Sequence, residues 1–171
     1  RDAQVVSKLD LAGVDLSGAD LGGAIFESVS LRGARLVGAT LLDAMLTQCD
    51  LTGADLTSAT MERAALDRCS LAEARLTGAR LKQAKLYGGS CARADFSGAA
   101  VATAVIAECD FAGASLAGLV FERTVLTKPG LQGARLDGSV LRQAVWVGAD
   151  FSGASLSGAR FEHGIFHDCT F

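Results

Sequence analysis

The chain has 171 residues, of which 50% are apolar but only 6% aromatic, and a formal net charge of −3. The charge argues against direct nucleic-acid binding, and a charged share of 20% argues against a disordered acidic tail. No run of eighteen apolar residues occurs, so the sequence predicts no membrane span.

An apolar residue stands at every fifth position from Val6 to Phe171, without insertion or slip. Two residues before these positions alanine occurs twenty times, and two residues after them glycine occurs sixteen times. A period of five fits neither regular element, because five residues turn an α-helix by about 500° and an odd step changes the face of a strand. We therefore predict one corner per five residues, with glycine supplying the positive φ that corners need.

Four right-angle corners close a square, so the sequence should also show a period of twenty. The cysteines that replace alanine are spaced by multiples of twenty residues, namely Cys49, Cys69, Cys109 and Cys169. The residues that precede the central apolar positions also form distinct columns at this period. The four sides of each coil are therefore predicted to differ, and successive coils to stack in register.

The repeated unit, as in Ala19-Asp20-Leu21, resembles the motif of the pentapeptide-repeat proteins, and the resemblance covers Val6 to Phe171. It implies an all-β fold, a right-handed quadrilateral β-helix of about eight coils of 20 residues, with the central and small residues inside. We expect residues 1–171 to form a single β-helix domain of a longer bacterial protein. The resemblance also implies that this protein acts as a scaffold or as a secretion-associated component.

Several positions along the chain depart from the repeat. Leu9 and Val14 are larger than alanine and are predicted to plug the first coil. Further along, the small column is interrupted at Leu119, Thr124, Pro129 and Ser139. Because proline cannot donate a ladder hydrogen bond, we expect a bulge or kink over residues 127–130 rather than a domain boundary.

No catalytic, cofactor-binding or metal-binding constellation is visible. His163 and His167 occupy outward positions, and a corner is expected between them. The five cysteines include no C-x-x-C pair and occupy inward positions, so we interpret them as small buried hydrophobic residues. We therefore predict no enzyme activity and no cofactor. Unpaired cysteines and the absence of a visible signal peptide favour a cytoplasmic location.

Two polar columns are predicted on the outer surface. One column alternates in sign, as in Asp15, Arg35 and Asp55, and should form a structural ladder of charges. The other carries an acidic set: Asp10, Asp50, Asp110 and Asp150. Quinolone-resistance members of the family mimic duplex DNA and bind type II topoisomerases (DNA gyrase), so this acidic face suggests that role as the alternative function.

A third column is apolar at an outward position where the family has Asp or Asn, and only Lys85 interrupts it. We define the apolar stripe as Val5, Ile25, Met45, Val105, Val125, Val145 and Ile165. A contiguous exposed apolar surface is typical of a protein interface. The alternative is that these β-branched residues pack well against each other on the strands and need no partner. We therefore predict a non-enzymatic protein-interaction scaffold. It would bind another protein or a second copy through this stripe or through the C-terminal end, where Phe161, Phe166 and Phe171 gather.

Overall fold

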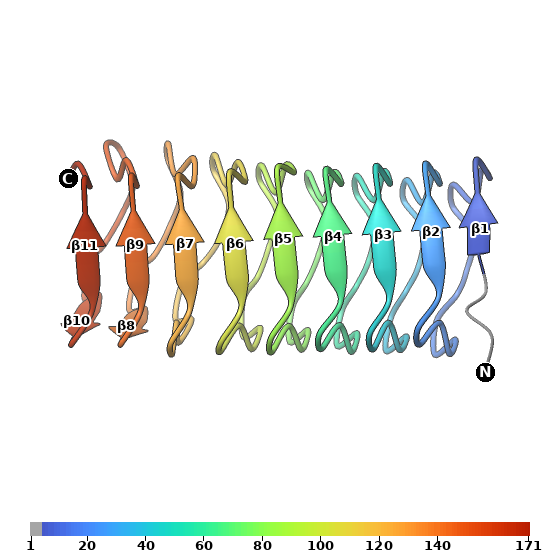
Figure 1. Cartoon of the computed structure of the whole chain (residues 1–171), viewed down its shortest axis with the longest axis horizontal. Helices are drawn as coiled ribbons and strands as arrows, with labels where there is room; N and C mark the ends of the chain where they lie inside the picture. Colours follow the sequence, from blue (N-terminus) through green and yellow to red (C-terminus); the bar gives the residue numbers. More distant parts are fainter. Residues whose placement is uncertain (1–4) are drawn as a thin grey trace.

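The computed structural model describes residues 5–171, which wind into one parallel β-solenoid without a helix in that range (Figure 1). One side of each coil contributes a three-residue strand to a nine-stranded parallel sheet. Its order is β1 (Val5–Ser7), β2 (Ile25–Glu27), β3 (Met45–Thr47), β4 (Ala65–Asp67), β5 (Lys85–Tyr87), β6 (Val105–Ala107), β7 (Val125–Thr127), β9 (Val145–Val147) and β11 (Ile165–His167). Paired residues are twenty apart, as in Val5 beside Ile25.

The other three sides stack through isolated parallel bridges, which also join residues twenty apart. We name these sides by the first residue of each column: the Asp10 side, the Asp15 side and the Asp20 side. On the Asp20 side, the last coils extend the bridges into a two-stranded sheet of β8 (Val140–Arg142) and β10 (Arg160–Glu162). Together with the side formed by the nine-stranded sheet, these columns confirm the predicted four-sided coil.

A residue with positive φ occurs at every fifth position from Lys8 to Asp168. In a corner such as Leu31–Ala34, the Ala34 N–H donates to the Leu31 carbonyl at 3.0 Å and Gly33 has φ 59°, as in a type II turn. Sixteen of these positive-φ residues are glycine, which confirms the predicted role of glycine. The other seventeen are non-glycine residues, so the stacked coils hold many side chains in a left-handed conformation that is otherwise unfavourable.

The corner that follows the nine-stranded sheet differs from most of the others, and three of the four cysteines in its column contact a strand carbonyl of the coil before. Within residues 5–171 no N–H–carbonyl bond closes this corner, so the carbonyls of Phe26, Leu46 and Trp146 lack the turn partner found elsewhere. A thiol of the next coil donates to each of them instead: Cys49 at 3.5 Å to Phe26, Cys69 at 3.4 Å to Leu46 and Cys169 at 3.4 Å to Trp146. These three cysteines thus offer a weak additional donor to strand carbonyls at this corner.

Pro129 stands in the same column as these cysteines. Its missing N–H costs little, because no residue of this column in the described chain donates its N–H to another backbone carbonyl. The stacking is nevertheless loosened beside it. The register predicts bonds from Leu131 N–H to the Asp150 carbonyl and from Asp150 N–H to the Pro129 carbonyl. Neither has good hydrogen-bond geometry, although the Gly130–Asp150 bridge remains, so these bonds are weakened rather than lost. The distortion is local, as expected, and the coil continues through it.

The interior is filled by the central residues, many of which are buried leucines, and by the alanines beside them. Towards the C-terminus aromatic rings replace leucine, and Trp146 packs against Phe121 and Phe151 with ring centroids 5.4 and 5.1 Å apart. At the other end, Leu9 and Val14 are 48% and 36% exposed.

Ser139 is completely buried in the small column, and its hydroxyl has no hydrogen-bond partner. Because a buried hydroxyl without a partner carries its full desolvation penalty, we expect Ser139→Ala to raise the free energy of unfolding by about 1 kcal/mol. Urea denaturation followed by circular dichroism measures this change.

Thr124 supplies the matched control, because it is equally buried but donates its hydroxyl to the Val101 carbonyl at 3.0 Å. Thr124→Val keeps the shape and removes that bond, so it should lower the free energy of unfolding by about 1 kcal/mol. A stability loss for Ser139→Ala would contradict the assignment of an unpaired hydroxyl.

Candidate functional site

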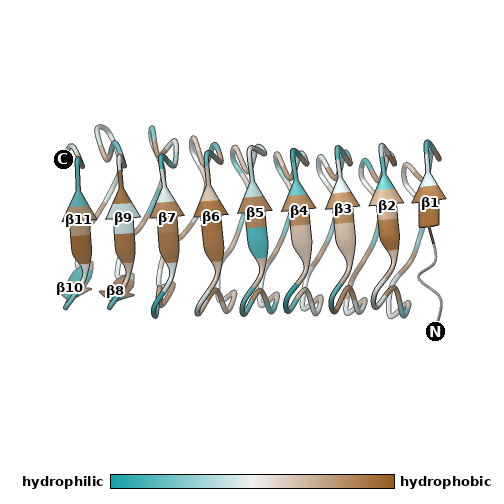
Figure 2. Cartoon of the chain, viewed as in Figure 1, coloured by the Kyte–Doolittle hydropathy of each residue, from teal (hydrophilic) through white to brown (hydrophobic). Residues whose placement is uncertain are grey.

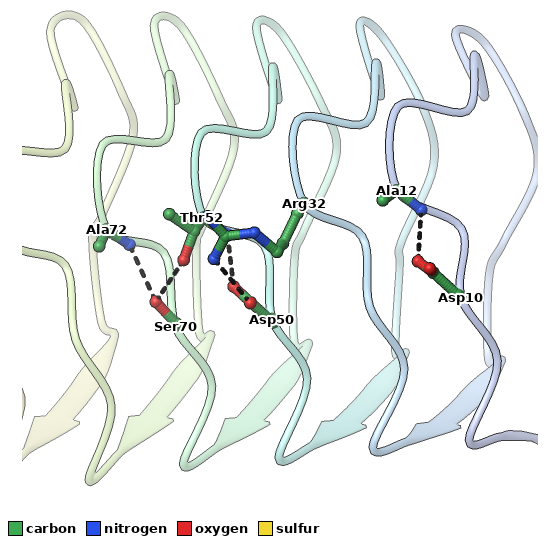
Figure 3. Close-up of polar contacts among 7 residues, drawn as sticks. All are labelled: Asp10, Ala12, Arg32, Asp50, Thr52, Ser70 and Ala72. Carbon is green, nitrogen blue, oxygen red and sulfur yellow. Dashed lines mark hydrogen bonds and ion pairs between the residues drawn. The ribbon is translucent and has the colours of Figure 1, made fainter.

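Aspartates that precede the central residues stabilise the corners that follow them. Asp10 accepts the Ala12 N–H at 3.0 Å, and Asp50 accepts the Thr52 N–H at 3.0 Å (Figure 3). Ser70 occupies the same column and bonds the Thr52 hydroxyl at 2.8 Å. A carboxylate that accepts the N–H two residues later forms an Asx turn. These aspartates therefore stabilise the corners of the coil.

The predicted acidic face exists as a column but is not a continuous acidic surface. Bridges place Asp10, Asp50, Asp110 and Asp150 in one line, separated by Ser30, Ser70, Ser90 and Gly130. Arg32 from the preceding coil forms an ion pair with Asp50 at 3.0 Å (Figure 3). Arg93 pairs with Glu73 on the same side. Both arginines of this side therefore offset part of its negative charge.

The Asp15 side carries the alternating ladder expected from the sequence. Arg35 lies 3.5 Å from Asp15 in the coil below it. Hydrogen bonds from the hydroxyl groups and then from the backbone N–H groups of Thr57 and Ser97 hold the pKa values of Asp55 and Asp95 below the ordinary value, and the charge of Arg75 adds a smaller effect. These carboxylates stay ionised at neutral pH. Because aspartate and arginine alternate from Asp15 to Asp95, like charges do not lie next to each other in this part of the column.

The apolar stripe is assembled by the nine-stranded sheet. Each of its residues is the first residue of a strand, so the register aligns them in one column, which is brown along most of its length in Figure 2. Val5, Met45 and Ile165 are exposed, whereas Ile25 and the three valines are half-buried between neighbouring strands. Lys85 in β5 divides the stripe, and Ala107 and Val147 widen it on the C-terminal side.

The C-terminal end presents a second apolar surface. Phe161 and Phe171 are 45% and 67% exposed, and their ring centroids are 6.1 Å apart. Phe166 lies between them and the core, with its ring stacked on Trp146 at 6.5 Å. The three phenylalanines singled out from the sequence therefore form one cluster at this end of the described solenoid.

The cysteines of residues 5–171 lie mostly in the interior. All five cysteines are free, and four of them are buried. The neighbouring Cys49 thiol and burial raise the pKa of the Cys69 thiol, and both thiols face the closed interior. No cluster of three or more His, Cys, Asp or Glu side chains within this range could hold a metal ion.

No helix within the described part of the chain is long and apolar enough to cross a membrane.

Reasoning from the sequence missed one feature, an open hollow on the Asp20 side. It is lined by Gly98, Ala99, Ala100, Val101, Ala102, Gly118, Val120 and Glu122. The only sequence signal beside it is Leu119, a large residue in the small column.

Comparison with known proteins agrees with this architecture. A family model described as pentapeptide repeats, in eight copies, matches residues 10–41, 36–71, 64–100, 104–143 and 138–171. The solved structure of HetL, a pentapeptide repeat protein involved in heterocyst differentiation regulation from the cyanobacterium Nostoc, is 29% identical. It matches with a TM-score of 0.52 over 94% of this chain and 84% of HetL.

A trypsin-treated variant of QnrB1, a plasmid-mediated fluoroquinolone resistance protein, is 20% identical, with a TM-score of 0.60 over 98% of this chain and 79% of that one. At this identity the likeness concerns the fold alone. No curated protein matches the chain. The repeated motif, the four-sided coil and the family model agree along almost the whole length, and the chain therefore belongs to the pentapeptide-repeat family.

Proposed function

We propose that this chain is a non-enzymatic protein-interaction module that binds another polypeptide through the apolar stripe. The observation that carries the proposal is the alignment of the stripe on a parallel sheet, where the register leaves apolar side chains on the outer surface. On the other three sides the corresponding columns are largely polar or charged. HetL, which resembles this chain, is described as involved in regulation, and that role agrees with an interaction module rather than an enzyme.

The stripe suits a partner with an elongated apolar face. Its strands repeat at the spacing of a parallel sheet, about 4.8 Å, so nine strands span roughly 40 Å. Val105, Val125 and Val145 are stiff β-branched residues, so ordering them on binding costs little side-chain entropy. Half-buried positions also limit the water that must be displaced from each residue.

Replacing Ile25, Val105 and Val145 together with lysine should weaken partner binding or self-association at least tenfold. Three ammonium groups would have to be desolvated at an apolar contact, a loss of more than about 1.4 kcal/mol. Self-association is measured by sedimentation velocity, and partner binding by quantitative capture from an extract of the source cells.

The matched control replaces Ala12, Ala72 and Ala112 on the Asp10 side with lysine, which adds the same charge to a different surface. Both variants are first shown to keep the β-sheet circular-dichroism spectrum. Unchanged association of the stripe variant, or an equal loss in both variants, would contradict the proposal.

A topoisomerase-binding role through mimicry of DNA is the alternative, and it has less support. It needs dense negative charge, whereas the aspartates of the acidic column cap turns and Arg32 and Arg93 neutralise neighbouring acids. A gyrase supercoiling assay separates the two functions. Inhibition or protection by the wild-type chain, lost when Asp10, Asp50, Asp110 and Asp150 are changed to asparagine, would favour the alternative.

A further inference from the structure

The ladder of the Asp20 side is interrupted between two coils. Successive bridges join Thr60 to Arg80, Arg80 to Ala100 and Val120 to Val140, but Ala100 and Val120 form none. In the preceding pair of coils the Leu81 N–H donates to the Ala100 carbonyl at 2.7 Å and the Ala100 N–H to the Ala79 carbonyl at 2.9 Å. The equivalent bonds, from Val101 N–H to the Val120 carbonyl and from Val120 N–H to the Ala99 carbonyl, are absent.

Leu119 explains the interruption. It is 1% exposed and stacks over Ala99 in a column that holds alanine in every preceding coil from Ala19 to Ala99. Its own turn bond, from the Leu119 N–H to the Leu116 carbonyl, is stretched to 3.4 Å, compared with 2.9 Å for the turn bond of Ala79. A leucine needs more room than an alanine along the axis, so the two coils separate at this corner.

The separation leaves an open hollow of about 310 Å³ with an unusual lining. Its side chains are small and apolar, as at Ala100, Ala102 and Val120, and Glu122 is the only charged residue of the lining. Ala99 and Val101 are buried, yet the Ala99 carbonyl and the Val101 N–H have no backbone partner. Both residues line the hollow, so an unpaired acceptor and an unpaired donor face it, as at the edge of a β-sheet.

We propose that this hollow is a binding site for one residue of an extended peptide segment from a partner protein. The Ala99 carbonyl and the Val101 N–H stand on either side of Ala100. An edge strand offers the same pair of groups, one acceptor and one donor, to a single residue of a neighbouring parallel strand. The N–H of the bound residue would donate to the Ala99 carbonyl, and its carbonyl would accept the Val101 N–H. A small apolar side chain would fill the space between Ala100 and Val120. The site lies on a different side from the apolar stripe, so it is independent of the function proposed above.

The probe for this site is N-acetyl-valine N-methylamide, the smallest molecule with the two peptide groups and an apolar side chain. In ¹⁵N-resolved spectra we expect saturable shifts of the Val101 and Val120 amides and none at Met61 and Arg80, the matching residues two coils earlier. In the free protein the Val101 and Val120 amides should exchange with solvent at least ~100-fold faster than those of Met61 and Arg80. Isobutanol, which has the apolar group without the peptide groups, should not reproduce the shifts.

Two variants test the origin of the site. Leu119→Ala should restore the ladder, protect Val101 and Val120 from exchange and abolish the shifts. Ala100→Leu fills the exposed hollow from outside, and it should abolish the shifts without closing the ladder even if Leu119→Ala does not fold. Protected Val101 and Val120 amides in the wild type would overturn the proposal. So would equal shifts with isobutanol, or shifts that persist in Ala100→Leu.

Discussion

Replacing Trp146 with alanine is expected to lower the free energy of unfolding by about 3–5 kcal/mol, the loss typical of removing a large aromatic residue from a core. Trp146 is completely buried and lies at the centre of the aromatic cluster formed with Phe121, Phe151 and Phe166. The interior of the coil is narrow and surrounded by backbone. Neighbouring side chains therefore cannot move in to fill the cavity that the indole ring leaves. Because Trp146 is the only tryptophan, the variant has no tryptophan fluorescence to follow, and the change is measured by urea denaturation with circular dichroism.

Trp146→Phe is the matched control. It keeps an aromatic ring in contact with Phe121 and Phe151, and it also removes the indole N–H, which is buried without a hydrogen-bond partner. The control should therefore lose much less stability than the alanine variant. Equal losses for the two variants would show that the aromatic packing is not what stabilises the C-terminal coils.

Gly89→Ala should destabilise the protein by about 3 kcal/mol, at the upper end of the cost of overpacking, although alanine is the commonest residue of the small column. A Cβ atom on Gly89 would lie 2.3 Å from the backbone oxygen of Cys69 in the coil below. Backbone cannot move away as a flexible side chain would, so the coils must separate. Thermal and urea denaturation measure the effect.

Gly53→Ala is the control that separates this steric clash from the conformational cost of replacing a glycine. Gly53 has φ +67° and nothing within 4 Å of an added Cβ, so only the left-handed conformation is penalised, at about 1 kcal/mol. If Gly89→Ala cost no more than Gly53→Ala, the close contact between the coils would be refuted.

The fold could be predicted from the sequence because stacking in register makes residues twenty apart neighbours. Once the chain turns a corner every five residues, each column must suit a single environment along the whole rod. The apolar column from Val6 to Phe171 therefore predicted the core, and the glycine positions predicted the corners. The column positions of the stripe and of the aspartates followed in the same way.

The sequence by itself thus determined the four-sided coil, the register and the side on which each residue lies. Only the tertiary structure decided how neighbouring coils share space: that cysteines donate to carbonyls at one corner, and that position 89 excludes a Cβ atom. It also decided that Leu119 separates two coils and leaves the Ala99 and Val101 backbone groups unpaired. The physical reason is that periodicity fixes which residues meet, whereas packing depends on side-chain volume and on bonds between coils, which no single position specifies.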